Sequence, residues 1–486
     1  MGDQPARYQL GPRSRRGLVA GWRGGQIAVT ASGLLLALGL MRLAGGPLGV
    51  VAALVTVLSA VAISTWPVAG RTAEQWAPAL VGHVTNEAAS RRVRASARAR
   101  SGLSGLSVQE CDQADNGRRL GVVSDTAEAT HTAVLPVAAV GYALADHEEQ
   151  SRRVASWASV LAGVAREGGN VHRLQWIVRA LPGAGGALVL PDHDARALAA
   201  KESYRALVEE VAPLMWSHEV LVAVTVRADR RTRARQPVGR AGLVVEELAA
   251  LRRRCVSAGL EVRPSLSRRE LAAAILRATA PCRLSPAGLD SSEVQGLASP
   301  PSGRSAGASF TSSPGSWPWP LGVKASWRSI RTDATFHAVY WVAGWPRGEV
   351  GPDFLTPLLL AGGVRLTFSV TMAPIPPLKA ARRAEHDRTS GVADAELRRR
   401  YGFATTSRSL KDHEATVRRE GELADGHAGY RYSGYLAVTE SDEASLERSC
   451  ARVELLAVQS GLEAHRMYGA QEAAFCFVLP TGRGCA

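Results

Sequence analysis

Lysine is scarce in this 486-residue chain, and the shortage bears directly on function. Only four of the 58 lysine and arginine residues are lysine: Lys201, Lys324, Lys379 and Lys411. None of them follows a glycine-rich turn, and the sequence contains no GxxxxGK[ST] motif. A Walker-type phosphate loop needs that lysine to reach the β- and γ-phosphates of a nucleotide. Nucleotide hydrolysis by that route is therefore excluded.

Other motifs of catalysis and metal binding are also missing. The six cysteines include no CxxC pair and show no metal-ligand spacing, and a chain this long and this poor in cysteine is not expected to rest on disulfides. Cys255 and Cys450 lie on apolar faces of predicted helices, which predicts buried free thiols. HExxH, GxSxG and a GxGxxG that closes a strand–helix turn are absent. We therefore predict a protein that is not an enzyme, with no catalytic residue, no metal site and no cofactor.

Positive charge is unevenly distributed along the chain. The formal net charge is +14, and residues 1–100 hold twelve arginines against three acidic residues. This clustering favours a membrane-topology signal over a nucleic-acid footprint. Direct contact with nucleic acid stays open through the basic run 230–240, although no nucleic-acid-binding motif accompanies it. The Asp192-His193-Asp194 triplet follows a proline and predicts an exposed polar turn.

Two long apolar runs, Gln26–Ala44 and Leu48–Trp66, flank a Gly-Gly-Pro link. Each run is close to the length that crosses a bilayer, so together they predict an antiparallel transmembrane hairpin. Arginines precede the first run and follow the second, which places both termini in the cytoplasm of a two-pass membrane protein. A signal peptide and a buried hairpin of a soluble core are the alternatives, and both fit the pattern less well. The residues expected at the membrane interface are Trp22, Arg23, Arg42, Trp66 and Arg71.

The rest of the chain divides by composition. Ala287–Ser316 is rich in Ser, Gly and Pro and predicts a linker between two lobes. The expected segments are a basic cytoplasmic tail at 1–25, the hairpin at 26–66, a juxtamembrane helix and tether at 67–119, a first α+β lobe at 120–286, the linker at 287–316 and a second α+β lobe at 317–486.

The two lobes resemble each other. Helix Ala241–Ala258 and helix Glu443–Ser460 carry apolar residues at the same spacing, and each pair differs by 202 positions. The same offset aligns Gly259 with Gly461, in each case a glycine expected to end the helix in the left-handed conformation. Strands upstream match more loosely. We therefore predict an internal duplication that gives two ferredoxin-like, split βαβ sandwiches.

Aromatic and basic residues of the second lobe predict a partner surface. Tryptophan is favoured at the centre of buried contacts between proteins. The candidates are Trp317, Trp319, Trp345, Arg398 and Arg399. A tryptophan seam in the core and a solvated charged helix are the alternatives for these residues.

Five stretches of the second lobe together carry a resemblance to a known family. They are Tyr340–Pro346, Asp353–Leu360, Arg365–Arg382, Arg419–Thr439 and Gly461–Gly484. Their order and spacing resemble the amino-terminal, pre-ATPase region of the traffic ATPases of conjugative type IV secretion systems. The amino-terminal "YQLGPRSRRGLVAGWRGGQ" with its two apolar runs resembles an actinobacterial family of integral membrane proteins from such clusters, and the hairpin is similar to PrgI-type small membrane subunits.

The resemblance implies a scaffold rather than a motor, because the sequence ends where the ATPase domain of those proteins begins. It implies a membrane-anchored, non-catalytic structural subunit of a conjugative DNA- or protein-transfer apparatus. The implied partners are a separate traffic ATPase, other membrane subunits and the lipid bilayer. A homo-oligomer stays open, and the alternative function is that of a membrane subunit of type VII secretion. The cargo and the surface that meets the ATPase do not follow from the sequence.

Overall fold

The computed structural model describes residues 24–65, 103–138, 145–182, 216–227, 240–281, 319–400 and 414–484, apart from a few positions within these ranges. They belong to two compact units, a helical hairpin and a larger α+β body.

The hairpin consists of α1 (Gly24–Ala44) and α2 (Gly46–Thr65). Gly45 between the helices and Gly46 at the start of α2 have φ values of 51° and 67°, a conformation that glycine adopts without steric cost. The helices pack closely, because a Cβ atom built on Gly33 would lie 2.3 Å from the Cβ of Ala60. The expected reversal of the chain is therefore present as a tight pair of helices.

The prediction that this hairpin is transmembrane is wrong. Among the described residues, no helix combines the length and the apolar character that membrane crossing requires. The prediction of a two-pass membrane protein with cytoplasmic termini is overturned with it.

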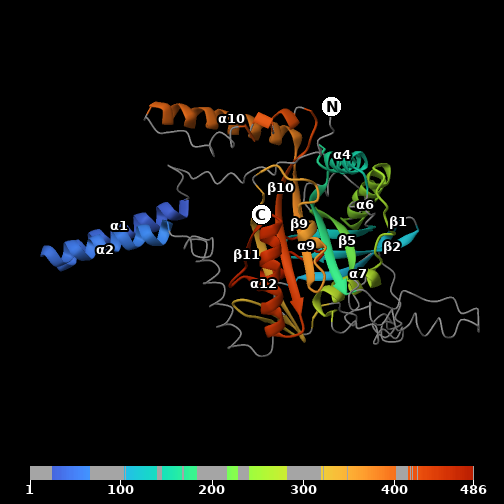
Figure 1. The fold of residues 1–486 in the computed structure, drawn as a ribbon, viewed down its shortest axis with the longest axis horizontal. Helices are drawn as coiled ribbons and strands as arrows, with labels where there is room; N and C mark the ends of the chain where they lie inside the picture. Colours follow the sequence, from blue (N-terminus) through green and yellow to red (C-terminus); the bar gives the residue numbers. More distant parts are fainter. Residues whose placement is uncertain are drawn as a thin grey trace, which may run out of the picture. The chain divides into compact units, whose positions relative to one another are not determined.

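The body is built on one antiparallel sheet (Figure 1). Eleven of the described strands form it, in the order β1-β2-β3-β5-β4-β9-β10-β8-β7-β6, with β11 paired to β8. The strands are β1 (Leu106–Asp115), β2 (Arg118–Asp125), β3 (Thr130–Val137), β4 (Val171–Pro182), β5 (Trp216–Arg227), β6 (Val323–Ala325), β7 (Ile330–Thr332), β8 (Thr335–Gly344), β9 (Arg365–Ile375), β10 (Gly429–Glu440) and β11 (Glu463–Arg466).

The strand order is mirrored about the pairing of β4 with β9. The first half of the sheet reads β2-β3-β5-β4 up to this junction, and the second reads β9-β10-β8-β7 beyond it. The junction itself is antiparallel and runs from Leu174 opposite Met372 to Arg179 opposite Thr367. The prediction of two separate sandwich lobes is therefore wrong. The two edge strands satisfy each other's backbone N–H and C=O groups, which separate lobes would leave unpaired.

Helices cover both faces of the sheet. The described helices of the body are α4 (His147–Val164), α6 (Arg240–Ser257), α7 (Arg268–Thr279), α9 (Thr356–Leu359), α10 (Pro377–Arg400), α12 (Glu443–Gln459) and α13 (Gln471–Phe475). α4 and α6 pack on the first half around Leu174, Val224 and Leu248. α9 and α12 pack on the same face of the second half around Phe368 and Leu436.

The two long helices agree with the periodicity of the sequence. α6 buries Val244, Leu248, Leu251 and Cys255, and α12 buries Leu446, Cys450, Val453 and Ala457. Gly259 and Gly461, which follow these helices, have φ values of 74° and 69°. The prediction of buried thiols at Cys255 and Cys450 is also confirmed, and burial raises the pKa of Cys255 to about 11.

Several predicted segments lie outside the described residues. They are most of the tail at 1–25, the linker at 287–316, the polar turn at 192–194 and the basic run up to residue 239. Residues 106–115, which were expected in the tether, form β1 instead and extend the sheet beyond β2.

Candidate functional site

The face of the sheet opposite α6 and α12 is unusually polar and holds the last described stretch of the chain. Residues 476–484, here called the C-terminal segment, run across the central strands. The side chains beneath it come from both halves of the sheet, and all of them are buried: Thr132, Gln175, Thr225, Ser369 and Thr371. Buried polar side chains on one face of a sheet need hydrogen-bond partners in the chain that lies over that face.

Gln175 on β4 is the centre of this contact. Its Nε2 lies 2.9 Å from the carbonyl oxygens of Phe477 and Leu479 and from Ser369 Oγ. Its Oε1 accepts a hydrogen bond from the backbone N–H of Gly482 at 2.8 Å. One fully buried amide therefore satisfies three backbone groups of the C-terminal segment.

On either side of Gln175, threonine hydroxyl groups also donate hydrogen bonds to the C-terminal segment. Thr132 donates to the carbonyl of Thr481 at 3.0 Å and lies 2.9 Å from the hydroxyl of Thr225. On the second half, Thr371 donates to the carbonyl of Arg483 at 2.9 Å. The segment is thus attached to both halves, across the junction of β4 with β9.

Charged groups secure the end of the segment. Arg483 Nε lies 2.6 Å from Asp125 Oδ2 on β2, and Arg173 donates to the carbonyl of Gly482 and pairs with Glu128. Burial alone would raise the pKa of Asp125, but the hydrogen bond and charge of Arg483, together with two backbone N–H groups, hold it below its usual value. The carboxylate is therefore kept ionised.

Only glycine fits at position 482. Its φ is 70°, and a Cβ atom built there would lie 1.8 Å from Thr225 Oγ1. The segment approaches the sheet this closely because Gly482 has no side chain.

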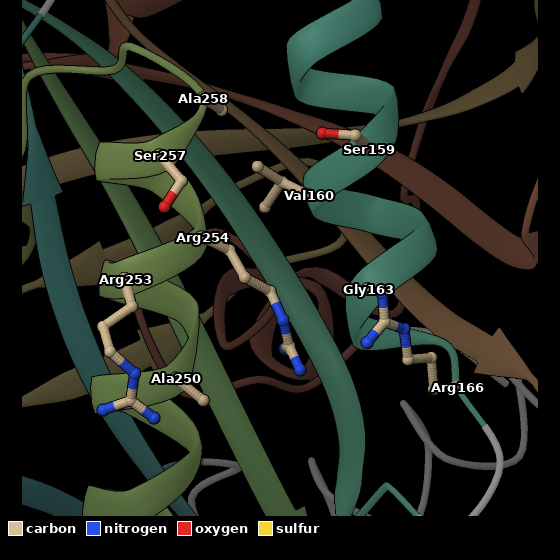
Figure 2. Close-up of a pocket in the computed structure, with 9 residues that line it drawn as sticks. All are labelled: Ser159, Val160, Gly163, Arg166, Ala250, Arg253, Arg254, Ser257 and Ala258. Carbon is tan, nitrogen blue, oxygen red and sulfur yellow. The ribbon is translucent and has the colours of Figure 1, made fainter.

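A second feature lies on the other face, between α4 and α6. A groove of about 420 Å³ is lined by Ser159, Val160, Gly163, Arg166, Ala250, Arg253, Arg254, Ser257 and Ala258. Figure 2 shows Arg254 extending from α6 toward α4, with Arg166 at the end of α4 nearby. No acidic residue lines the groove.

The position of the Arg254 side chain depends on the absence of a side chain at Gly163. A Cβ atom at Gly163 would lie 2.9 Å from Arg254 Nε, so any larger residue would displace the arginine. Behind α4, the hydroxyl of Tyr430 donates to the carbonyl of Leu161 at 2.6 Å. Burial raises the pKa of Tyr430, and the nearby charge of Arg254 opposes this rise. The groove is therefore basic, and one of the helices that line it, α4, is bonded to β10 through Tyr430.

The residues predicted from the sequence do not gather in one site. Among the partner-surface candidates, Trp319 is buried, and Trp345 packs edge-on against Phe368 and Tyr432 with ring centroids 6.3 and 5.4 Å apart. Arg398 and Arg399 lie in α10, whose side chains the structure does not describe there, and Trp317 lies outside the described residues.

Of the membrane-interface candidates, the structure describes Arg42 alone, exposed in the last turn of α1. Trp22, Arg23, Trp66 and Arg71 lie outside the described residues.

Sequence reasoning missed Gln175, Asp125, Arg254 and Gly482. A polar residue inside an otherwise apolar strand, such as Gln175 in "VHRLQWIV", is the signal that was available for a buried hydrogen-bonding network. The groove had a weaker signal, the Arg252-Arg253-Arg254 run on an amphipathic helix.

With this geometry established, comparison with known proteins adds no relationship. No protein-family model matches the chain, and no curated protein is similar to it at a significant level.

Proposed function

We propose that this chain is a non-catalytic structural subunit of a type IV secretion-like transfer apparatus, on which a separate traffic ATPase docks. The proposal includes no membrane anchor. It rests on the resemblance of the second-half segments to the pre-ATPase region of traffic ATPases, and on how those segments are arranged.

One observation carries the proposal. The stretch Gly461–Gly484, which in the resembling ATPases leads toward the motor domain, is held against both halves of the sheet by Gln175, Thr132 and Thr371. Most of its last nine described residues are buried, so the part that can meet a partner is Phe477, Arg483 and Gly484, which are half-buried and held in one conformation. A preorganised surface loses little conformational entropy on binding, which favours a docking platform.

The test is co-purification of the full chain with a traffic ATPase encoded beside it. We expect the parent chain to retain the ATPase, and Asp125→Asn to reduce retention at least fivefold because it loosens Arg483 at the end of the segment. Arg448→Gln on α12 is the matched control: it also changes the net charge by one unit, but Arg448 is exposed and bonds only locally to Ser445. Equal retention by all three proteins would contradict docking through this segment.

The non-catalytic part of the proposal has its own test. The purified chain is expected to show no ATP turnover. Turnover that one point substitution abolishes would overturn the assignment as a structural subunit.

A further inference from the structure

The basic groove between α4 and α6 plays no part in the proposed docking, and its charge is not accounted for by the fold. Other buried or half-buried arginines of the body are paired with carboxylates. Examples are Arg179 with Glu219, Arg252 with Asp115 and Arg466 with Glu447. Arg254 is half-buried, whereas Arg166 and Arg253 are exposed, and within the described residues no carboxylate pairs with any of the three.

Uncompensated guanidinium groups repel one another, and an anion that binds between them relieves the repulsion. Arginine presents a planar fork of N–H donors that matches the oxygens of a phosphate group bidentately. Arg254 lies on α6 and Arg166 lies two residues beyond the end of α4, so one oxyanion can be contacted from two sides (Figure 2). The hydroxyls of Ser159 and Ser257 add donors at its margin.

The size and the small lining residues of the groove suit a small molecule. Its volume of about 420 Å³ falls in the range of ligand sites. Small residues, Gly163, Ala250 and Ala258, keep it open. Gly163 near the end of α4 is unfavourable for a helix, yet it leaves the space that Arg254 occupies.

The fold does not require arginine at positions 253 and 254 of α6. At the offset of 202 that aligns α6 with α12, Arg253 and Arg254 correspond to Leu455 and Leu456. Leu456 packs against the apolar core beneath α12. The same helix in the same kind of layer is therefore stable with leucine at these positions.

We propose that the α4–α6 groove binds a small phosphate-bearing molecule, whose oxyanion is held by Arg254 and Arg166. The shared chemistry is a di- or polyphosphate group, and its source is either inorganic or a nucleotide. This inference is independent of the proposed docking of an ATPase.

Isothermal titration calorimetry of the full chain at low ionic strength tests the proposal, with pyrophosphate and ADP as separate ligands and no added metal. We expect one site with a dissociation constant of about 1 mM or lower, which weakens as salt is added. Tighter binding of ADP would assign a nucleotide as the source, and equal binding would assign the phosphate group alone.

Variants locate the site. Arg254→Gln combined with Arg166→Gln is expected to weaken pyrophosphate binding at least tenfold, and Gly163→Ala several-fold because it displaces Arg254 without removing a charge. Arg448→Gln, with the same charge change as one arginine substitution in the groove, is expected to bind like the parent. Thermal unfolding of each variant verifies that it is folded.

Three results would overturn the proposal. The first is the absence of pyrophosphate and ADP binding to the parent chain; a loss of stability in the arginine variants would then assign the guanidinium groups to neutralising the carboxyl end of α4. The second is binding that Gly163→Ala and the double arginine variant leave unchanged. The third is an acidic peptide that displaces pyrophosphate at lower concentration, which would assign the groove to a protein partner.

Discussion

The two halves of the sheet share an arrangement of strands and helices but use the same positions differently. On one face, α6 meets the long helix α4 across a basic groove, whereas α12 meets the short helix α9 through apolar contacts that include Leu358. A common architecture thus carries an open, charged surface in one half and a closed, apolar one in the other.

The opposite face shows a second contrast. Thr132 faces Thr225 across β3 and β5, and the corresponding pair across β8 and β10 is His337 with Thr439. Thr132 reaches the carbonyl of Thr481, which comes from the second half of the chain. Beside His337, Thr332 reaches the carbonyl of Thr279, which comes from the first half. Each half therefore supplies a backbone carbonyl that accepts a hydrogen bond from a threonine of the other half.

The protonation of His337 follows from this network. The single hydroxyl proton of Thr332 goes to the carbonyl of Thr279, so Thr332 Oγ1 accepts from His337 Nε2 at 2.6 Å. His337 Nδ1 then accepts from the hydroxyl of Thr439 at 2.9 Å. Burial lowers the pKa of His337 to about 3, so the ring is neutral at physiological pH.

The largest expected effect tests the contrast between Gln175 on β4 and Thr367, its counterpart on β9. Gln175→Ala should lower the free energy of unfolding by on the order of 4 kcal/mol, because several buried backbone groups of the C-terminal segment lose their partner. Thr367, at the matching position of β9, is also buried. Among the described residues, the hydrogen bonds to the C-terminal segment come from other side chains. Thr367→Ala should cost less than about 1 kcal/mol. Denaturant unfolding of the full chain measures both, and similar losses would contradict a special role for Gln175.

An intermediate effect concerns pH and His337. In the unfolded chain the imidazole has a pKa of about 6.5, whereas in the folded chain burial lowers it to about 3. Between these values the unfolded state binds more protons, so stability rises with pH in this window. Acidification from pH 7 to pH 5 should therefore remove about 2 kcal/mol through His337.

His337→Thr, which installs the residue found in the first half, should remove this part of the pH dependence whatever it does to absolute stability. Unfolding curves at pH 5 and pH 7 give the difference for parent and variant. An unchanged difference would show that His337 is protonated in the folded protein or that other groups set the slope.

The smallest expected effect on the free energy of unfolding tests the comparison of α6 with α12. Arg253→Leu combined with Arg254→Leu gives α6 the residues of α12 and should change the free energy of unfolding by no more than about 1 kcal/mol. Removal of mutual repulsion offsets the exposure of leucine. The same variant should lose the pyrophosphate binding proposed for the groove. A loss of several kcal/mol would instead show that the arginines hold α4 in place.

Prediction from the sequence succeeded where the signal was local. Val244 through Cys255 and Leu446 through Ala457 repeat at helical spacing, and their burial followed from that spacing alone. It failed for the apolar pair α1 and α2, whose composition predicts a membrane span that no helix among the described residues supports. It also missed the continuous sheet, because the edges of β4 and β9 carry no mark of the strand that will pair with them.

The sequence by itself determined the registers of α6 and α12, their glycine caps and the burial of their cysteines, because each depends on residues within a few turns of one helix. Only the tertiary structure decided that the halves share one sheet, that residues 476–484 lie across it, and that Arg166 and Arg254 face one groove. Those contacts join residues up to 358 positions apart, as between Asp125 and Arg483. Such pairings depend on which surfaces meet when the chain packs, and no local periodicity encodes them.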